Sequence, residues 1–147
     1  MNLTNILPDF KLLNQDNKMV SSADLIGKSA LVIYFYPKDD TPGCTAEACA
    51  FRDQFEAFTD AGALVFGISA DSVESHKLFA EKYRLSFDLL SDPGNKIRQQ
   101  FGVPRSMFGL LPGRVTYIFN KQGELIHQFN SQLNAKKHII EALAALS

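Results

Sequence analysis

Apolar residues recur along the chain with two different spacings. Residues 31–36 form a nearly unbroken run of β-forming apolar side chains, typical of a strand buried on both faces, and residues 63–69 form a second run. A helical spacing follows each run. The first helical set ends before Gly62, and Asp71 or Ser72 can cap the second. The sets are Ala48, Phe51, Phe55 and Phe58, then Val73, His76, Phe79, Ala80 and Tyr83. From residue 31 to residue 83 the predicted order is therefore strand, helix, strand, helix.

The remaining segments predict shorter elements. Residues 87–90 predict a strand, 91–94 a turn, 97–101 a short helix and 102–113 a loop. Residues 116–120 and 124–129 predict a hairpin, and Asn134 can cap a terminal helix that carries Ile139, Ile140, Leu143 and Leu146. Residues 1–28 predict a small extra hairpin with a turn at Asp16-Asn17. We expect one α/β domain over residues 1–147, with a mixed sheet flanked by helices and an N-terminal hairpin extension.

Composition and charge exclude several classes of function. Lys and Arg number 15 against 16 Asp and Glu, the formal net charge is −1, and basic residues occur at most in pairs, so nucleic acid is not an expected partner. No stretch approaches the ~20 apolar residues of a membrane span, and the N-terminus lacks the pattern of a signal peptide. Two cysteines are too few for a disulfide-stapled secreted protein. We expect a soluble protein in a reducing compartment, with its thiols available for chemistry.

Cys44 is the strongest candidate for a reactive group. It follows the predicted central strand at the start of the next helix, at the carboxyl end of the sheet where open α/β folds usually hold their sites. Unpaired backbone N–H groups and the helix dipole favour a thiolate there. The alternative is a buried structural cysteine, which is common.

Cys49 lies five residues after Cys44, a spacing that an intact helix makes incompatible with a disulfide. Five residues turn a helix by about 500° and leave the Cα atoms roughly 8.7 Å apart. A disulfide tolerates no more than about 7 Å. A bond between Cys44 and Cys49 therefore requires the first helical turns to unwind. The alternative is a small helix residue packed beside Phe51.

Other polar residues have simpler interpretations. His76, His127 and His138 are widely spaced and share no pattern with the cysteines, so we predict neither a metal site nor a cofactor. Asp39 and Asp40 are interpreted as turn formers. The apolar loop 106–111 is interpreted as core packing, with a hydrophobic rim for an apolar substrate or a docking patch as the alternatives.

The residues around Cys44 resemble a known family. Pro37-x-x-x-Thr41-x-x-Cys44 matches the active-site motif of peroxiredoxins. The longer segment from Tyr34 to Arg52, with Cys49 inside it, is similar to the peroxiredoxin Q (bacterioferritin comigratory protein) branch. Further similarity, of the plant and cyanobacterial type, lies at Gly67-Ile-Ser-Ala-Asp71, Leu90-Ser-Asp92 and Phe108-Gly-x-Leu-Pro-Gly-Arg114-x-Thr-Tyr117. The resemblance implies a thioredoxin fold.

The resemblance also implies residue roles. Cys44 would be the peroxidatic cysteine, and Cys49 the resolving cysteine that closes an intramolecular disulfide with it. Thr41 would supply a hydroxyl, Arg114 a fixed guanidinium for thiolate and peroxide, and Pro37 an apolar lid. Without the motif, Arg114 would be interpreted as a solvated charge. Glu47 is a secondary candidate, although the helix dipole also explains a carboxylate there.

The leading hypothesis is a peroxiredoxin enzyme that reduces hydrogen peroxide and organic hydroperoxides and is recycled by thioredoxin or a related dithiol protein. One alternative is a redox sensor or docking protein that uses the same cysteine pair as a switch. Another is a disulfide isomerase, which the spacing of Cys44 and Cys49 disfavours. We expect a monomer or weak dimer in the cytoplasm, with a plastid chain whose transit peptide has been removed as the alternative.

Overall fold

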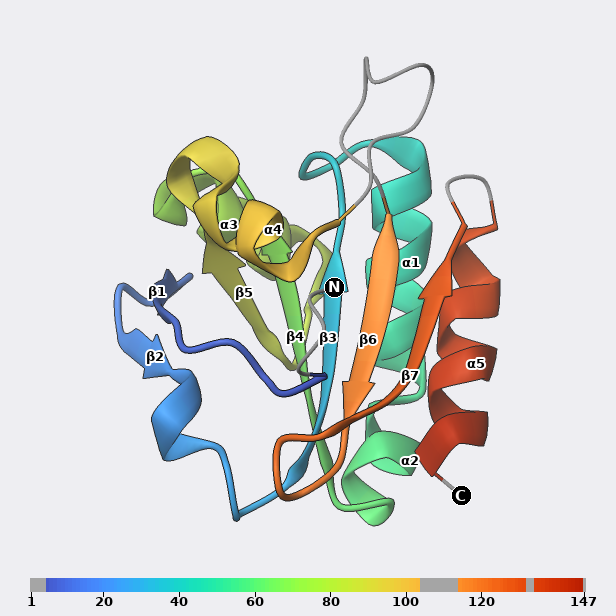
Figure 1. Ribbon diagram of the computed structural model, residues 1–147. Helices are drawn as coiled ribbons and strands as arrows, with labels where there is room; N and C mark the ends of the chain where they lie inside the picture. Colours follow the sequence, from blue (N-terminus) through green and yellow to red (C-terminus); the bar gives the residue numbers. More distant parts are fainter. Residues whose placement is uncertain (1–4, 104–113, 132–133, 147) are drawn as a thin grey trace.

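A seven-stranded mixed sheet forms the centre of the molecule. The computed structural model describes residues 5–103, 114–131 and 134–146. The strands lie in the order β2-β1-β5-β4-β3-β6-β7 (Figure 1). Strands β3, β4 and β5 are parallel, whereas the other neighbouring pairs are antiparallel. Their bounds are β1 Lys11–Asn14, β2 Met19–Ser21, β3 Ala30–Phe35, β4 Ala63–Ser69, β5 Asp88–Ser91, β6 Val115–Phe119 and β7 Leu125–Asn130.

Strand β3 has apolar side chains on both faces because both faces of the sheet are covered. Val32 and Tyr34 belong to one core cluster, whereas Leu31, Ile33 and Phe35 belong to the other. Residues of the helices α1 (Pro42–Asp53), α2 (Phe55–Asp60), α3 (Val73–Tyr83) and α5 (Ala135–Leu146) complete the first cluster. Helix α4 (Lys96–Phe101) and the N-terminal segment complete the second. The predicted central buried strand is confirmed.

The segment after Cys44 differs from its prediction. The spacing of Phe51, Phe55 and Phe58 predicts one continuous helix, but the structure has two helices, because Gln54 leaves the helical conformation at φ −106° and ψ 14°. Residues seven apart in a straight helix are separated by about 10 Å along the axis. The rings of Phe51 and Phe58 have centroids only 5.5 Å apart. The break at Gln54 therefore changes the course of the helix, and both rings pack in the same core cluster.

The caps and the hairpins agree with the prediction more closely. The Ser72 hydroxyl accepts the Ser75 N–H at 3.1 Å at the start of α3, and Asn134 Oδ1 accepts the Lys137 N–H at 3.3 Å at the start of α5. The N-terminal hairpin pairs β1 antiparallel with β5, so it extends the main sheet instead of standing apart from it. Short 3-10 turns occupy Ser22–Asp24 and Pro93–Asn95. The α/β fold with a mixed sheet and flanking helices is confirmed.

Within the part of the chain that the structure describes, no helix is both long enough and apolar enough to cross a bilayer.

Candidate active site

Cys44 lies in the first turn of α1, just past the carboxyl end of β3 (Figure 1). Pro42 occupies the start of the helix, where its missing N–H does no harm. The first intrahelical hydrogen bond runs from Thr45 N–H to Thr41 O at 2.8 Å, so the amides of Gly43 and Cys44 precede the helical ladder. The Cys44 side chain is 1% exposed. The sulfur is therefore close to the positive end of the helix and shielded from bulk water.

Arg114 connects Cys44 to Glu47. Its Nη2 donates to Cys44 Sγ at 3.3 Å, and its Nη1 donates to Glu47 Oε1 at 2.6 Å. The pairing of Phe35 with Val115 brings the start of β6, and with it Arg114, beside the end of β3. Arg114 is 3% exposed, so the alternative of a solvated charge is wrong. Burial lowers the pKa of Arg114, but the charges of Glu47 and Cys44 outweigh burial and leave it raised.

Gly43 makes this approach of Arg114 possible. A Cβ atom at position 43 would lie 2.9 Å from Arg114 Nη2, closer than real Cβ contacts. The guanidinium is already held on two sides, by Glu47 and by Cys44, so it has little freedom to move away. Gly43, directly before Cys44, therefore leaves the space that the guanidinium of Arg114 needs.

Glu47 is fully buried one turn after Cys44. Burial raises the pKa of Glu47 to about 8, although the charge and hydrogen bond of Arg114 act in the opposite direction. Its second oxygen, Oε2, has no hydrogen-bond partner among the described residues and lies 3.6 Å from His138 Nδ1. Glu47 thus holds Arg114 from the side away from the Cys44 sulfur, a contact that the helix dipole alone does not explain.

His138 reaches Glu47 from α5. Its Nε2 lies 2.8 Å from the carbonyl of Ser131, which can only accept, so Nε2 carries a hydrogen. Burial, together with the charge of Arg114 and against the hydrogen bond to Ser131, lowers the pKa of His138 to about 4. The neutral ring therefore accepts at Nδ1 from the Thr116 hydroxyl, 2.7 Å away. The sequence interpretation considered His138 only as a metal ligand and missed this role. Its position on the buried stripe of α5, with Ala135, Ile139 and Ala142, was the available signal.

The other two predicted residues, Thr41 and Pro37, lie in the segment that leads from β3 into α1. Thr41 is half-buried, and its hydroxyl donates to Lys38 O at 2.9 Å, which leaves the lone pairs of Oγ1 free to accept a hydrogen from a bound ligand. Pro37 is half-buried four residues earlier. The apolar loop at 106–111 lies outside the residues that the structure describes, so its interpretation stays a prediction.

Cys49 lies in the same intact helix as Cys44. Both residues are within α1, Cys49 is half-buried, and both thiols are free. This conformation is the one in which helix geometry keeps the two sulfurs from bonding. It can hold a reactive thiol, and it has to open before a disulfide can form.

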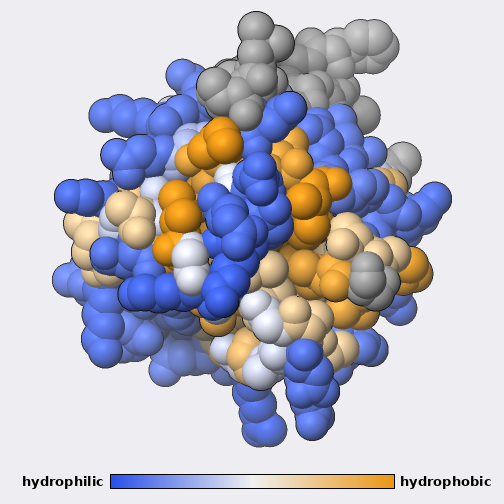
Figure 2. Space-filling model, turned by 60° about the horizontal axis from the view of Figure 1, so that its bottom comes forward, coloured by the Kyte–Doolittle hydropathy of each residue, from blue (hydrophilic) through white to orange (hydrophobic). Residues whose placement is uncertain are grey.

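A cavity lies at the end of the sheet opposite to Cys44. Figure 2 brings that end forward and shows apolar side chains gathered there around hydrophilic ones. The cavity has a volume of about 400 Å³ and is lined chiefly by Met19, Val20, Leu25, Phe55, Leu64, Phe66 and Phe87, with Asp24 and Asp88. It contains no cysteine, so the reactive thiol chemistry belongs to the end of the sheet near Cys44.

Comparisons with known proteins agree with this geometry. The model of the AhpC/TSA family matches residues 3–128. A chloroplastic peroxiredoxin Q of Triticum aestivum is 54% identical over 136 residues, which are 92% of this chain and 62% of that protein. The chloroplastic peroxiredoxin Q of Sedum lineare is 54% identical over 95% of this chain and 74% of that protein. The chain thus spans roughly two thirds of the length of these plant relatives.

Solved structures extend the similarity to bacteria. The crystal structure of the peroxidoxin BcpB of Mycobacterium tuberculosis superposes with a TM-score of 0.87 at 35% identity and covers 96% of this chain and 93% of that one. The bacterioferritin comigratory protein of Xanthomonas campestris, solved in a study of its alkyl peroxide reduction activity, has a TM-score of 0.84 at 32% identity, with coverage of 93% and 89%. The chain therefore belongs to the AhpC/TSA family, in its peroxiredoxin Q branch.

Proposed function

We propose that the chain is a thiol-dependent peroxidase that reduces hydrogen peroxide and organic hydroperoxides. The observation that carries the proposal is the guanidinium of Arg114, which donates to the sulfur of a buried cysteine at a helix N-terminus. A fixed cation there stabilises the thiolate and the charge that grows on the peroxide oxygens as their bond breaks. The alkyl peroxide reduction activity named for the X. campestris relative supports organic hydroperoxides as substrates.

In the first step the thiolate of Cys44 attacks the terminal oxygen of the peroxide. The O–O bond breaks, a proton completes the leaving alcohol or water, and Cys44 becomes a sulfenic acid. Arg114 holds the thiolate and the peroxide, Thr41 Oγ1 accepts from the peroxide hydroxyl, and Pro37 limits the access of water. Glu47 holds Arg114 in place from behind.

In the second step the thiol of Cys49 displaces water from the Cys44 sulfenic acid and forms a disulfide. Helix α1 has to unwind locally for the sulfurs to meet. Thioredoxin or a related dithiol protein then reduces this disulfide and is itself oxidised to one. The chain needs neither metal nor cofactor in this scheme, and it acts as a monomer or weak dimer.

The names of the plant relatives also bear on location. They are chloroplastic proteins, and this favours the plastid alternative over the cytoplasmic one for the present chain. We therefore propose a role in peroxide defence of a plastid or of a similar reducing compartment.

Rapid mixing with hydrogen peroxide tests the proposal, followed by mass spectrometry of the unreduced protein and turnover with thioredoxin. We expect stoichiometric peroxide consumption, an intramolecular Cys44 to Cys49 disulfide and recovery with thioredoxin. Cys44→Ser should abolish the reaction, whereas Cys49→Ser should complete one fast turnover and stop at the sulfenic acid. Reaction at the rate of an ordinary free thiol would contradict a peroxidase and favour the redox-switch alternative.

A further inference from the structure

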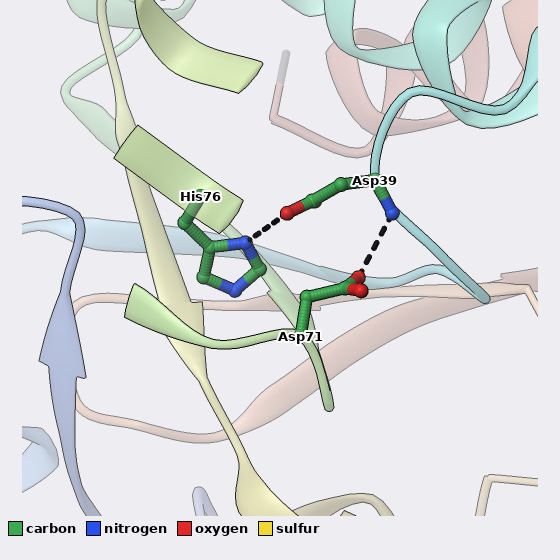
Figure 3. A group of neighbouring side chains, drawn as sticks. All are labelled: Asp39, Asp71 and His76. Carbon is green, nitrogen blue, oxygen red and sulfur yellow. Dashed lines mark hydrogen bonds and ion pairs between the residues drawn. The ribbon is translucent and has the colours of Figure 1, made fainter. Parts of the chain in front are cut away.

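The loop before α1 is fastened to α3 by a buried carboxylate. Asp39 lies between Pro37 and Thr41 and is 8% exposed. Its Oδ1 accepts from the Tyr36 hydroxyl at 2.6 Å, and its Oδ2 accepts from the Ser75 hydroxyl at 2.8 Å. The same Oδ2 lies 2.7 Å from His76 Nδ1 (Figure 3). Asp39 therefore does more than form a turn, which was the interpretation from the sequence.

Both ring nitrogens of His76 face protein oxygens. Nε2 lies 3.0 Å from the carbonyl oxygen of Leu90, which can only accept, so Nε2 carries a hydrogen. Nδ1 lies 2.7 Å from Asp39 Oδ2, so one hydrogen is held between the ring and the carboxyl group. The ring is fully buried and Asp39 is nearly so. Loss of either partner would therefore leave the other buried without its hydrogen bond, which is costly.

Asp71 holds the backbone of the same loop. Its Oδ2 accepts from the Asp39 N–H at 2.8 Å (Figure 3). It also accepts from the Ser69 hydroxyl at 2.7 Å. Ligand atoms of Asp39, Asp71 and His76 lie within 4.8 Å of one another. A metal would need a free lone pair on the histidine, but both ring nitrogens are already engaged with protein oxygens, those of Asp39 and Leu90. The cluster therefore acts as an anchor for the loop and not as a metal site.

We propose that Asp39 and His76 are positioning residues, which hold Pro37 and Thr41 at the peroxide site and confine the opening of α1 to residues after Thr41. The inference rests on the proposed peroxidase function and on the Cys44 to Cys49 disulfide. Loss of the anchor lets the loop move with the helix. Attack on the peroxide then slows, since Thr41 and Pro37 lose their places, while α1 opens more often and the disulfide closes faster.

The chain offers a matched control at the next residue. Asp40 also contacts α3, through Lys82 Nζ at 2.8 Å and the Tyr83 hydroxyl at 2.7 Å, but its contacts are exposed. Exposed ion pairs contribute little. Asp40 has φ 56°, a left-handed conformation that asparagine also adopts readily. Asp40→Asn thus makes the same chemical change as Asp39→Asn, one residue away and at the surface.

Rapid mixing of each reduced variant with one equivalent of hydrogen peroxide separates the two phases. We expect Asp39→Asn and His76→Gln to slow the peroxide phase about tenfold and to speed the disulfide phase about threefold, with Asp40→Asn within twofold of the wild type in both. Ser75→Ala removes only one hydrogen-bond donor to Asp39, so it should change the rates of both phases in the same directions as Asp39→Asn but by smaller factors. It provides the test if Asp39→Asn and His76→Gln do not fold. Equal behaviour of the Asp39 and Asp40 variants would overturn the proposal.

Hydrogen exchange of the reduced proteins tests the anchor without any peroxide chemistry. We expect faster exchange confined to residues 37–50 in Asp39→Asn, and wild-type exchange there in Asp40→Asn. Exchange that rises evenly over the whole chain would reduce the role of Asp39 to general stability and overturn the proposal. The two proposals can also fail separately. If the wild type lacks fast peroxide chemistry while Asp39→Asn still shows faster exchange confined to residues 37–50, the proposed function is rejected and the anchor is kept.

Discussion

The proposed peroxide site depends on the free space around the guanidinium of Arg114. Arg114 contacts the Cys44 sulfur and the Glu47 carboxyl at once, and position 43 has to lack a side chain for Arg114 to fit. Contacts of this kind are strongest in the transition state, when charge spreads over sulfur and oxygen. A displacement of the guanidinium by less than an ångström therefore affects the rate more than the fold.

Gly43→Ala should lower the second-order rate constant for peroxide by about ten- to a hundredfold, because the new methyl group displaces Arg114 from the sulfur. Alanine favours a helix over glycine by roughly 0.5–1 kcal/mol, so the free energy of unfolding should stay equal or rise. Rapid-mixing kinetics and urea unfolding of the reduced protein measure both quantities. Unchanged kinetics would mean that Arg114 has room to adjust, and lost stability would point to a packing defect instead.

Sequence reasoning identified the residues of the motif but not those that support them. Cys44, Thr41, Pro37 and Glu47 lie within one short segment, and a family resemblance was needed to add Arg114, 70 positions away from Cys44. The supporting residues His138 and His76 were not predicted as parts of the site, because their partners are distant in the chain. His138 meets Thr116 across 22 positions, and His76 meets Asp39 across 37. Such contacts follow from strand order and helix placement, which local periodicity does not specify.

Elements were predicted well where burial sets the apolar pattern of a strand and poorly where helices change direction. The double-sided apolar pattern of β3 located the centre of the sheet. The apolar spacing after Cys44 continues through Gln54, so it gave no sign that α1 ends at Asp53. The break accompanies the packing of the Phe58 ring against the Phe51 ring, a tertiary contact that the local spacing does not specify. The break also leaves α1 as a separate unit of 12 residues, which can open without taking α2 with it.

Opening of α1 should be visible by circular dichroism. The disulfide form should lose helical signal at 222 nm equivalent to roughly one to two turns, because residues 44–49 cannot stay helical when the two sulfurs are bonded. The reduced wild type and peroxide-treated Cys49→Ser provide the controls, and both should keep the full signal. A disulfide confirmed by mass spectrometry with undiminished helical signal would contradict local unwinding.

At the scale of the whole molecule, the site joins elements from both halves of the chain. Cys44 and Glu47 come from α1 and His138 from α5, whereas Arg114 directly precedes β6 and Thr116 lies within it. Two buried groups in this junction have perturbed pKa values of opposite direction. The pKa of Glu47 is raised to about 8 and that of His138 is lowered to about 4, chiefly by burial in both cases. The junction therefore couples the stability of the folded molecule to pH.

The signs of the two effects differ. Between about pH 4 and 6.5 the unfolded chain binds a proton on His138 that the folded chain lacks, so the free energy of unfolding rises with pH. Glu47 acts the other way from its unfolded value near 4.5 up to about 8, since the folded chain keeps a proton that the unfolded chain has lost. Its contribution is complete below pH 4.5 and is lost as the pH rises through 8. Above pH 6.5 only the contribution of Glu47 remains of the two.

Glu47→Gln should therefore flatten the pH dependence of stability between pH 6.5 and 8. A single proton contributes at most about 1.4 kcal/mol per pH unit, and we expect the wild type to lose up to that much more than the variant over each unit. Urea unfolding of the reduced proteins at several pH values in this window measures the difference. Glu56→Gln, at an exposed position on α2, is the matched control and should keep the wild-type slope. Parallel slopes for the wild type and Glu47→Gln would mean that Arg114 keeps Glu47 ionised in the folded protein, so that the carboxylate and the guanidinium form a permanent ion pair behind the reactive sulfur.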